Sequence, residues 1–181
     1  MRLASSPTLE LALLGFLRRQ PRHGYAIHGL LSDPAGLGPV WRLKRSQLYA
    51  LLNKLEDAGY VTTSLEPQES RPPRKLFHLT SSGEAAFLDW VQSPVQHGRS
   101  LRLEFLVRLY FARREGPEVV ARLLAAQREQ CQAWLAEEQA ILHEEEQSGH
   151  TYGQLVHQYR LGQIEAMLAW LDHCEENIRD S

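Results

Sequence analysis

Apolar residues recur at helical spacing three times within the first 60 residues, and each run ends where a helix must stop. The first run follows Pro7 and ends before Pro21, and the second covers residues 25–32, ahead of a loop rich in glycine and proline. The third run begins near Ser46, whose hydroxyl can accept a hydrogen bond from a free backbone N–H, and ends at Gly59. Three short helices are therefore predicted.

The hydrophobic period then changes from helical to extended. Residues 60–64 are rich in β-forming side chains, and residues 75–80 alternate their apolar positions, so two strands are expected. Between them, residues 66–74 contain three prolines and are too long for a tight hairpin. This segment predicts a projecting loop, the wing.

A fourth helix is expected after the second strand. Thr80 or Ser81 is its predicted cap, and Glu84 is placed to complete a capping box from Ser81. The resulting order, three helices, two strands and a helix, is that of a winged helix-turn-helix.

The second half of the chain has helical periodicity throughout, and helices are predicted at residues 100–114, 117–147 and 152–178. Each of the two longer helices extends on the order of 40 Å at about 1.5 Å per residue, which is more than one small domain covers, so we expect a homodimer. The predicted fold class is mainly α: a winged helix-turn-helix domain at residues 1–95, and an all-α antiparallel helical dimerisation domain at residues 96–181.

Charge differs between these two parts, although the net charge of the chain is only -2. Residues 1–95 carry 11 Lys and Arg against 8 Asp and Glu, a net of +3, whereas residues 96–181 carry 9 against 14, a net of -5. A polyanionic partner would therefore meet the first half. No apolar run approaches the roughly 20 residues of a membrane span, and no signal peptide is recognisable, so a cytoplasmic protein without membrane contact is expected.

The sequence lacks the motifs of an enzyme or a metal protein. It has no glycine-rich phosphate loop and no nucleophile motif, and the histidines of its last third are not three or four residues apart. Cys131 and Cys174 are far apart and are interpreted as packing thiols. We therefore expect neither catalysis nor a cofactor nor a bound metal.

Three stretches carry a family resemblance. In chain order, their diagnostic residues are Leu13, Leu14, Pro21, Arg22, His23, Gly24 and Tyr25; then Leu48, Tyr49, Leu52, Leu55, Glu56 and Gly59; and then Arg71, Pro72, Arg74, Lys75, Leu79, Thr80 and Gly83. Together these stretches, within residues 9–92, resemble the PadR family, whose members combine a winged helix with a C-terminal helical dimerisation region. The resemblance implies a DNA-binding transcriptional regulator.

The third predicted helix has the two faces that a recognition helix needs. Its apolar face consists of Leu48, Leu51, Leu52 and Leu55. The residues expected on its other face, facing DNA, are Arg45, Ser46, Gln47, Tyr49, Asn53 and Lys54. Arg45 and Gln47 are assigned to bases, and the last three to bases or backbone.

Two further groups of candidate DNA contacts flank this helix. Arg71, Arg74 and Lys75 lie on the wing, where they are expected to enter the minor groove or hold phosphate. His23 and Tyr25 begin the second helix, whose positive end attracts phosphate. For His23, a role in stabilising the turn is an equal alternative.

The predicted partner is double-stranded DNA, bound by a homodimer at an inverted repeat whose half-sites lie about 34 to 36 Å apart. The resemblance implies repression, and release by a small aromatic or apolar effector bound near the dimer interface. Aromatic side chains of the second half and its border are candidates for that pocket, or else belong to the core: Trp90, Phe105, Tyr110, Trp134 and Trp170. The alternative is a winged-helix module that binds another protein and not DNA.

Overall fold

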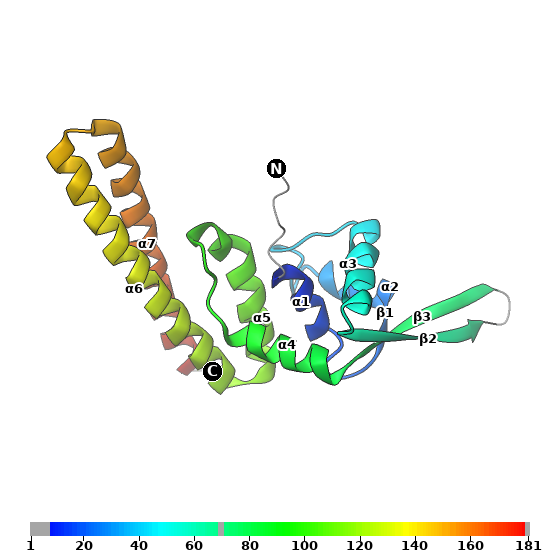
Figure 1. Cartoon of the computed structure of the whole chain (residues 1–181). Helices are drawn as coiled ribbons and strands as arrows, with labels where there is room; N and C mark the ends of the chain where they lie inside the picture. Colours follow the sequence, from blue (N-terminus) through cyan, green and yellow to red (C-terminus); the bar gives the residue numbers. More distant parts are fainter. Residues whose placement is uncertain (1–7, 69–70, 180–181) are drawn as a thin grey trace.

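The computed structural model describes residues 8–68 and 71–179 (Figure 1). Its first half contains four helices and a small sheet in the predicted order. These elements are α1 (Thr8–Gly15), β1 (Arg22–His23), α2 (Gly24–Leu31), α3 (Arg45–Asp57), β2 (Val61–Gln68), β3 (Arg71–Leu79) and α4 (Ser81–Gln92). The winged helix-turn-helix fold and the mainly α class are confirmed.

The sheet differs from the expectation in two respects. It has three antiparallel strands in the order β1-β3-β2, and β1, which pairs Arg22 with Phe77, was not predicted because two residues are too few to show an alternating pattern. The expectation of a loop over residues 66–74 was wrong for the described residues, since β2 extends to Gln68 and β3 begins at Arg71. Pro67 fits because the register shifts between Glu66 and Gln68.

The prolines of β3 are tolerated for a different reason. β1 covers the outer edge of β3 only beside Leu76 and Phe77, so β3 is an edge strand at Pro72 and Pro73. The wing is therefore a long two-stranded ribbon that projects from the helices (Figure 1).

Helix caps also correct two expectations. Lys44, not Ser46, precedes the first residue of α3, and the Lys44 N–H donates to Oε1 of Gln47 at 3.0 Å. Thr80 caps α4 by accepting a hydrogen bond from the Gly83 N–H at 3.1 Å, as one of the two alternatives predicted. Glu84 forms no capping box from Ser81, because its carboxylate binds Arg18, in the turn after α1.

The second half is helical, as expected. After a 3-10 turn (Gly98–Ser100) and a π-helical turn (Leu101–Phe105) come α5 (Leu106–Glu115), α6 (Pro117–Ser148) and α7 (Thr151–Arg179). The helices α6 and α7 lie side by side and antiparallel (Figure 1), and Gly149 ends α6 in the left-handed conformation at φ 70°. In the described part of the chain, no helix has the length and apolarity to cross a membrane.

One continuous core extends through both halves. Leu13, Ile27 and Leu48 are fully buried in the first half, and Phe111 of α5 packs against Phe16 and Phe87, with ring centroids 5.1 and 5.7 Å apart. Each such side chain contributes about 1.5–3 kcal/mol by leaving water. These contacts cross residue 95, so the division of the chain there stays a prediction.

Candidate nucleic-acid interface

The exposed face of α3 carries the residues predicted for DNA contact. Leu48, Leu52 and Leu55 are buried against α1 and α2, whereas Leu51 is half-buried. All of the predicted contact residues are exposed: Arg45, Ser46, Gln47, Tyr49, Asn53 and Lys54. The leucine spacing thus turns one polar face of the helix to solvent.

Two side chains of this face already have partners within the chain. The Gln47 side-chain oxygen accepts the Lys44 N–H, which orients the amide at the start of α3. Lys54 Nζ lies 2.7 Å from Oε1 of Glu10 in α1. Since the Lys54 side chain is 58% exposed, this ion pair is weak, roughly 0.2–1 kcal/mol, and can open when a phosphate approaches.

Tyr49 joins the face of α3 to the start of α2. Its ring lies directly over Gly24, where an added Cβ would be only 2.6 Å from Cε1 of the tyrosine. A glycine is therefore required at position 24 because a neighbouring aromatic ring occupies the space of a side chain. This contact accounts for the glycine of the histidine-glycine-tyrosine stretch in the sequence.

A stack of three side chains connects the start of α2 with the wing. The rings of His23 and Tyr25 are parallel within 13°, with centroids 5.3 Å apart, and the Arg74 guanidinium lies 5.2 Å from the Tyr25 centroid. His23 Nδ1 is 3.0 Å from the Lys75 carbonyl oxygen, and Nε2 is 3.1 Å from a carboxylate oxygen of Glu66. With both ring nitrogens engaged, His23 fits the alternative role of holding the turn and the wing together.

Lys75 holds the base of the wing against α3. Its Nζ lies 3.1 Å from Oε2 of Glu56, and the Thr63 hydroxyl donates to the other carboxylate oxygen at 2.5 Å. The Thr63 hydrogen bond, followed by Lys75, lowers the pKa of Glu56. Among the described wing cations, Arg74 alone has no carboxylate partner; the Arg71 side chain lies outside the described part.

The five candidate pocket aromatics are not brought into one site. Trp90 and Phe105 are buried, Trp90 against Phe87, and of the five only Phe105 and Trp170 form a described ring contact with each other, which is T-shaped. Tyr110 packs against Phe111 and under the Arg114 guanidinium. Trp134 lines a groove of about 640 Å³ between residues 96–102 and the helices α6 and α7, together with Arg99, Arg102, Ile164 and Met167.

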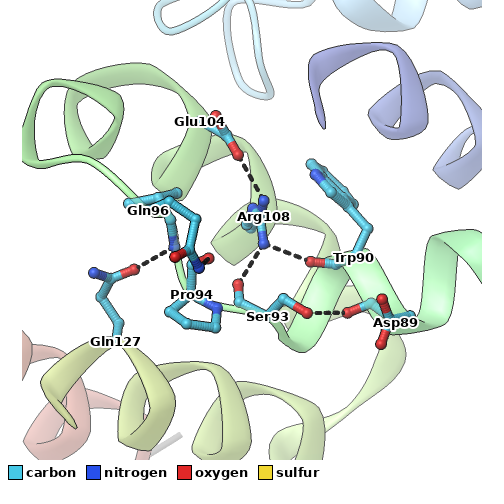
Figure 2. Close-up of polar contacts among 9 residues, drawn as sticks. Asp89, Trp90, Ser93, Pro94, Gln96, Glu104, Arg108 and Gln127 are labelled. Carbon is cyan, nitrogen blue, oxygen red and sulfur yellow. Dashed lines mark hydrogen bonds and ion pairs between the residues drawn. The ribbon is translucent and has the colours of Figure 1, made fainter. Parts of the chain in front are cut away.

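A buried polar cluster was missed from the sequence (Figure 2). Arg108 of α5, only 3% exposed, donates to the carbonyl oxygens of Trp90, at 2.9 Å, and of Ser93, and it pairs with Glu104 at 2.6 Å. Burial lowers the pKa of Arg108, and Glu104 opposes that shift. The available signal was an acidic and a basic residue four apart within the apolar run of residues 101–112.

Family profiles match most of the chain. The profile described as the Transcriptional regulator PadR-like family matches residues 13–89, and that of Virulence activator alpha C-term matches residues 101–179. The chain therefore carries a PadR-like domain. That domain contains α3, both wing strands and the three stretches that carried the resemblance.

Curated relatives agree with this assignment. The Negative transcriptional regulator PadR of Bacillus subtilis is 33% identical over 103 residues, 57% of this chain and 56% of that protein. The Probable transcriptional regulator Rv1176c of Mycobacterium tuberculosis is 26% identical over 91 residues, 50% of this chain and 47% of that protein. The chain thus spans about half the length of the curated relatives it matches, and both relatives are named as transcriptional regulators.

Two solved structures of described PadR or PadR-like proteins are similar to this chain. Bacillus subtilis PadR in complex with operator DNA is 26% identical, with 94% of this chain and 97% of that chain covered at a TM-score of 0.47. The PadR-like transcriptional regulator BC1756 from Bacillus cereus is 21% identical, with 98% of this chain and 99% of that chain covered at a TM-score of 0.45.

Residues 90–100 lie between the two profile matches of this chain. Trp90 and Ser93, whose carbonyl oxygens accept hydrogen bonds from Arg108, belong to this segment.

Proposed function

We propose that the chain is a sequence-specific DNA-binding transcriptional regulator, and that its PadR-like domain binds double-stranded DNA through α3 and the wing. The observation that carries this proposal is the continuity of one polar surface. It begins on the exposed face of α3, continues over the Tyr49 ring, which covers Gly24, and reaches Arg74 through the stacked ring of Tyr25. A helix for the major groove and a cation-bearing ribbon beside it are the two parts that a winged helix uses.

Different side chains of this surface suit different parts of a duplex. Arg45, at the N-terminal end of α3, has the side-chain type that binds guanine, and Asn53 the type that binds adenine. Arg74 is the main phosphate or minor-groove contact of the wing, joined by Arg71. Lys54 and Lys75 are exposed enough to exchange their carboxylates for phosphates.

The proposal includes a homodimer formed by residues 96–181. At the start of α7, three large apolar side chains lie within one face and are largely exposed: Tyr152 by 80%, Leu155 by 59% and Tyr159 by 67%. A second copy of the chain would cover this face, and two PadR-like domains would then read two halves of an inverted repeat. Residues 1–95 are the DNA-binding domain in this scheme.

Repression in the cytoplasm is the mode of regulation that the family resemblance implies, and a small apolar or aromatic effector is its proposed signal. The groove beside Trp134 is the candidate effector site, because an aromatic ring, Met167 and two arginines line it. The effector would act from residues 96–102, next to the PadR-like domain.

Selection of bound fragments from genomic DNA tests the proposal. We expect enrichment of a short inverted repeat, and binding to a duplex of that sequence should weaken steeply with salt. Arg45→Ala should reduce the preference for the selected sequence over a scrambled duplex, whereas Arg128→Ala, in α6, should not. No enriched fragment, together with no retention on heparin at low salt, would favour the protein-binding alternative.

A further inference from the structure

One side chain, the Arg108 guanidinium, connects α5 with the end of α4. We call Arg108 with its partners Trp90, Ser93 and Glu104 the Arg108 cluster. The guanidinium belongs to α5, and two of its acceptors are backbone carbonyls at the end of α4, at Trp90, and just beyond it, at Ser93 (Figure 2). Its plane also lies over the Trp90 ring, 5.1 Å from the centroid. Because a guanidinium is planar and its donors point in fixed directions, it fits these acceptors in one orientation only.

Burial makes alternative orientations costly. Arg108 and Glu104 are 3% and 6% exposed, so water does not replace a lost partner of either charge. The Arg108 Nε is already buried without an acceptor, so if α5 turned relative to α4, the guanidinium would also lose its two carbonyls and leave further donors buried and unpaired. The contact therefore favours one orientation of α5 relative to α4.

A second contact fastens the connecting residues to the long helices. Gln127 of α6 is fully buried, and its side-chain oxygen accepts the Val95 N–H at 2.8 Å. Val95 is itself fully buried. The beginning of the segment between α4 and α5 is thus held at two points, at Ser93 by Arg108 and at Val95 by Gln127.

We infer that Arg108 is a positioning residue that fixes the direction of α6 and α7 relative to α3, and thereby sets the spacing between half-sites that the dimer accepts. This inference rests on the proposed function. Adding one base pair between two half-sites moves them apart by about 3.4 Å and rotates one relative to the other by about 35°. A dimer discriminates against that change only if each α3 is held rigidly on its own pair of long helices.

The sharpest variant is Arg108→Lys. A lysine can keep the ion pair with Glu104, but its single ammonium cannot also reach both carbonyls in the plane of the original guanidinium. The matched control is Arg128→Lys, because Arg128 also binds two acceptors, Asp172 at 2.5 Å and Glu175 at 3.1 Å, but only between α6 and α7. Circular dichroism and thermal unfolding establish that each variant is folded.

The orientation of α6 relative to α3 can be measured without DNA. Spin labels at Ala58→Cys and Ala136→Cys, both exposed positions, report the distance between the end of α3 and α6. Cys174 is replaced by serine, Cys131 is buried and stays, and labelled protein is diluted with unlabelled protein so that only distances within one chain are seen. Arg108→Lys should broaden the distance distribution about twofold or more, and Arg128→Lys should leave it unchanged.

A DNA readout then tests the consequence. Duplexes carrying the selected inverted repeat, with the spacer lengthened or shortened by one base pair, are compared with the original. We expect the wild type to prefer the original by about tenfold, and Arg108→Lys to lose most of that preference. A wild-type distance width and an unchanged spacing preference in folded Arg108→Lys would overturn the inference.

The inference remains testable if Arg108→Lys does not fold or if the wild type binds no duplex. If Arg108→Lys does not fold, Gln127→Met, which removes the acceptor of Val95 at nearly constant volume, should broaden the same distances, and a wild-type width there would refute the rigid joint. If the wild type binds no duplex at any spacing, the proposed function fails, whereas the spin-label widths still test the positioning role of Arg108.

Discussion

The Arg74 guanidinium lies 5.2 Å from the centroid of the Tyr25 ring, and this contact joins the wing to the beginning of α2. A cation on an aromatic face has no opposite charge beside it, whereas the charge of a cation paired with a carboxylate is compensated. The wing therefore presents Arg74 in a fixed place with its attraction for phosphate intact. Lys75 next to it is bound to Glu56 and serves partly to hold the ribbon.

Arg74→Ala should reduce the salt dependence of DNA binding. Loss of one phosphate contact lowers the slope of log affinity against log salt by about 1. Lys75→Ala should lower that slope by less, because Glu56 already compensates part of its charge. Fluorescence anisotropy with the selected duplex at four salt concentrations measures both slopes. Equal slopes for Arg74→Ala and the wild type would remove Arg74 from the interface.

Gly24→Ala should destabilise the protein by about 1–3 kcal/mol, because the new methyl group would lie 2.6 Å from the Tyr49 ring. Gly29→Ala is the control in the same helix, since a Cβ there meets nothing within 4 Å, and it should stabilise by about 0.5–1 kcal/mol. Urea unfolding measures both changes. Adding Tyr49→Ala to Gly24→Ala should recover part of the loss; no recovery would mean that the ring is not the cause.

Glu56→Gln should weaken folding at neutral pH and not in acid. The pKa of Glu56 is lower in the folded protein than its ordinary value of 4.5, so its ionised form favours folding at pH values above that value. The contribution, on the order of 1 kcal/mol for a partly exposed carboxylate, disappears as the pH falls through the folded-state pKa. Urea unfolding between pH 7 and pH 3 tests this. A stability difference between wild type and variant that stays constant with pH would contradict it.

Charges placed on the exposed apolar face of α7 should dissociate the proposed dimer. Leu155→Glu with Tyr159→Glu puts two carboxylates where the second copy would pack, and loss of central contacts costs about 2 kcal/mol or more each. Sedimentation equilibrium should show mainly monomer for this variant and a dimer for Ala58→Glu, an added charge at an exposed site of the PadR-like domain. A double variant that still sediments as a dimer would place the interface elsewhere.

The helices could be predicted because burial leaves a regular trace in the sequence. Leu48, Leu52 and Leu55 recur at the helical period, and their spacing alone determined which face of α3 is exposed. The long helices after Gly116 were equally evident, since proline and glycine mark their ends. Most of the candidate DNA surface followed from these periods together with the position of the wing.

Features that depend on tertiary contacts left no such trace. Strand β1 exists because His23 and Arg22 pair with β3, which is more than 50 residues away. The wing strands pass through prolines that are harmless only on an open edge. For Arg108, the sequence shows only a carboxylate four residues away in an apolar run, and its carbonyl acceptors at Trp90 and Ser93 cannot be inferred from that spacing.

Because α6 is long, a small rotation near its start moves its far end by a large distance. With 32 residues and a rise of about 1.5 Å per residue, this helix is about 48 Å long, so a rotation of about 5° at one end displaces the other by about 4 Å. The same rotation moves an atom about 6 Å from the pivot by only about 0.5 Å, which is the whole range of donor–acceptor distances that an N–H···O hydrogen bond covers. A small displacement at the start of α6 is thus enlarged about eightfold at its far end. The buried contacts of Arg108 therefore have to hold the start of the long helices closely if their far ends are to keep one position.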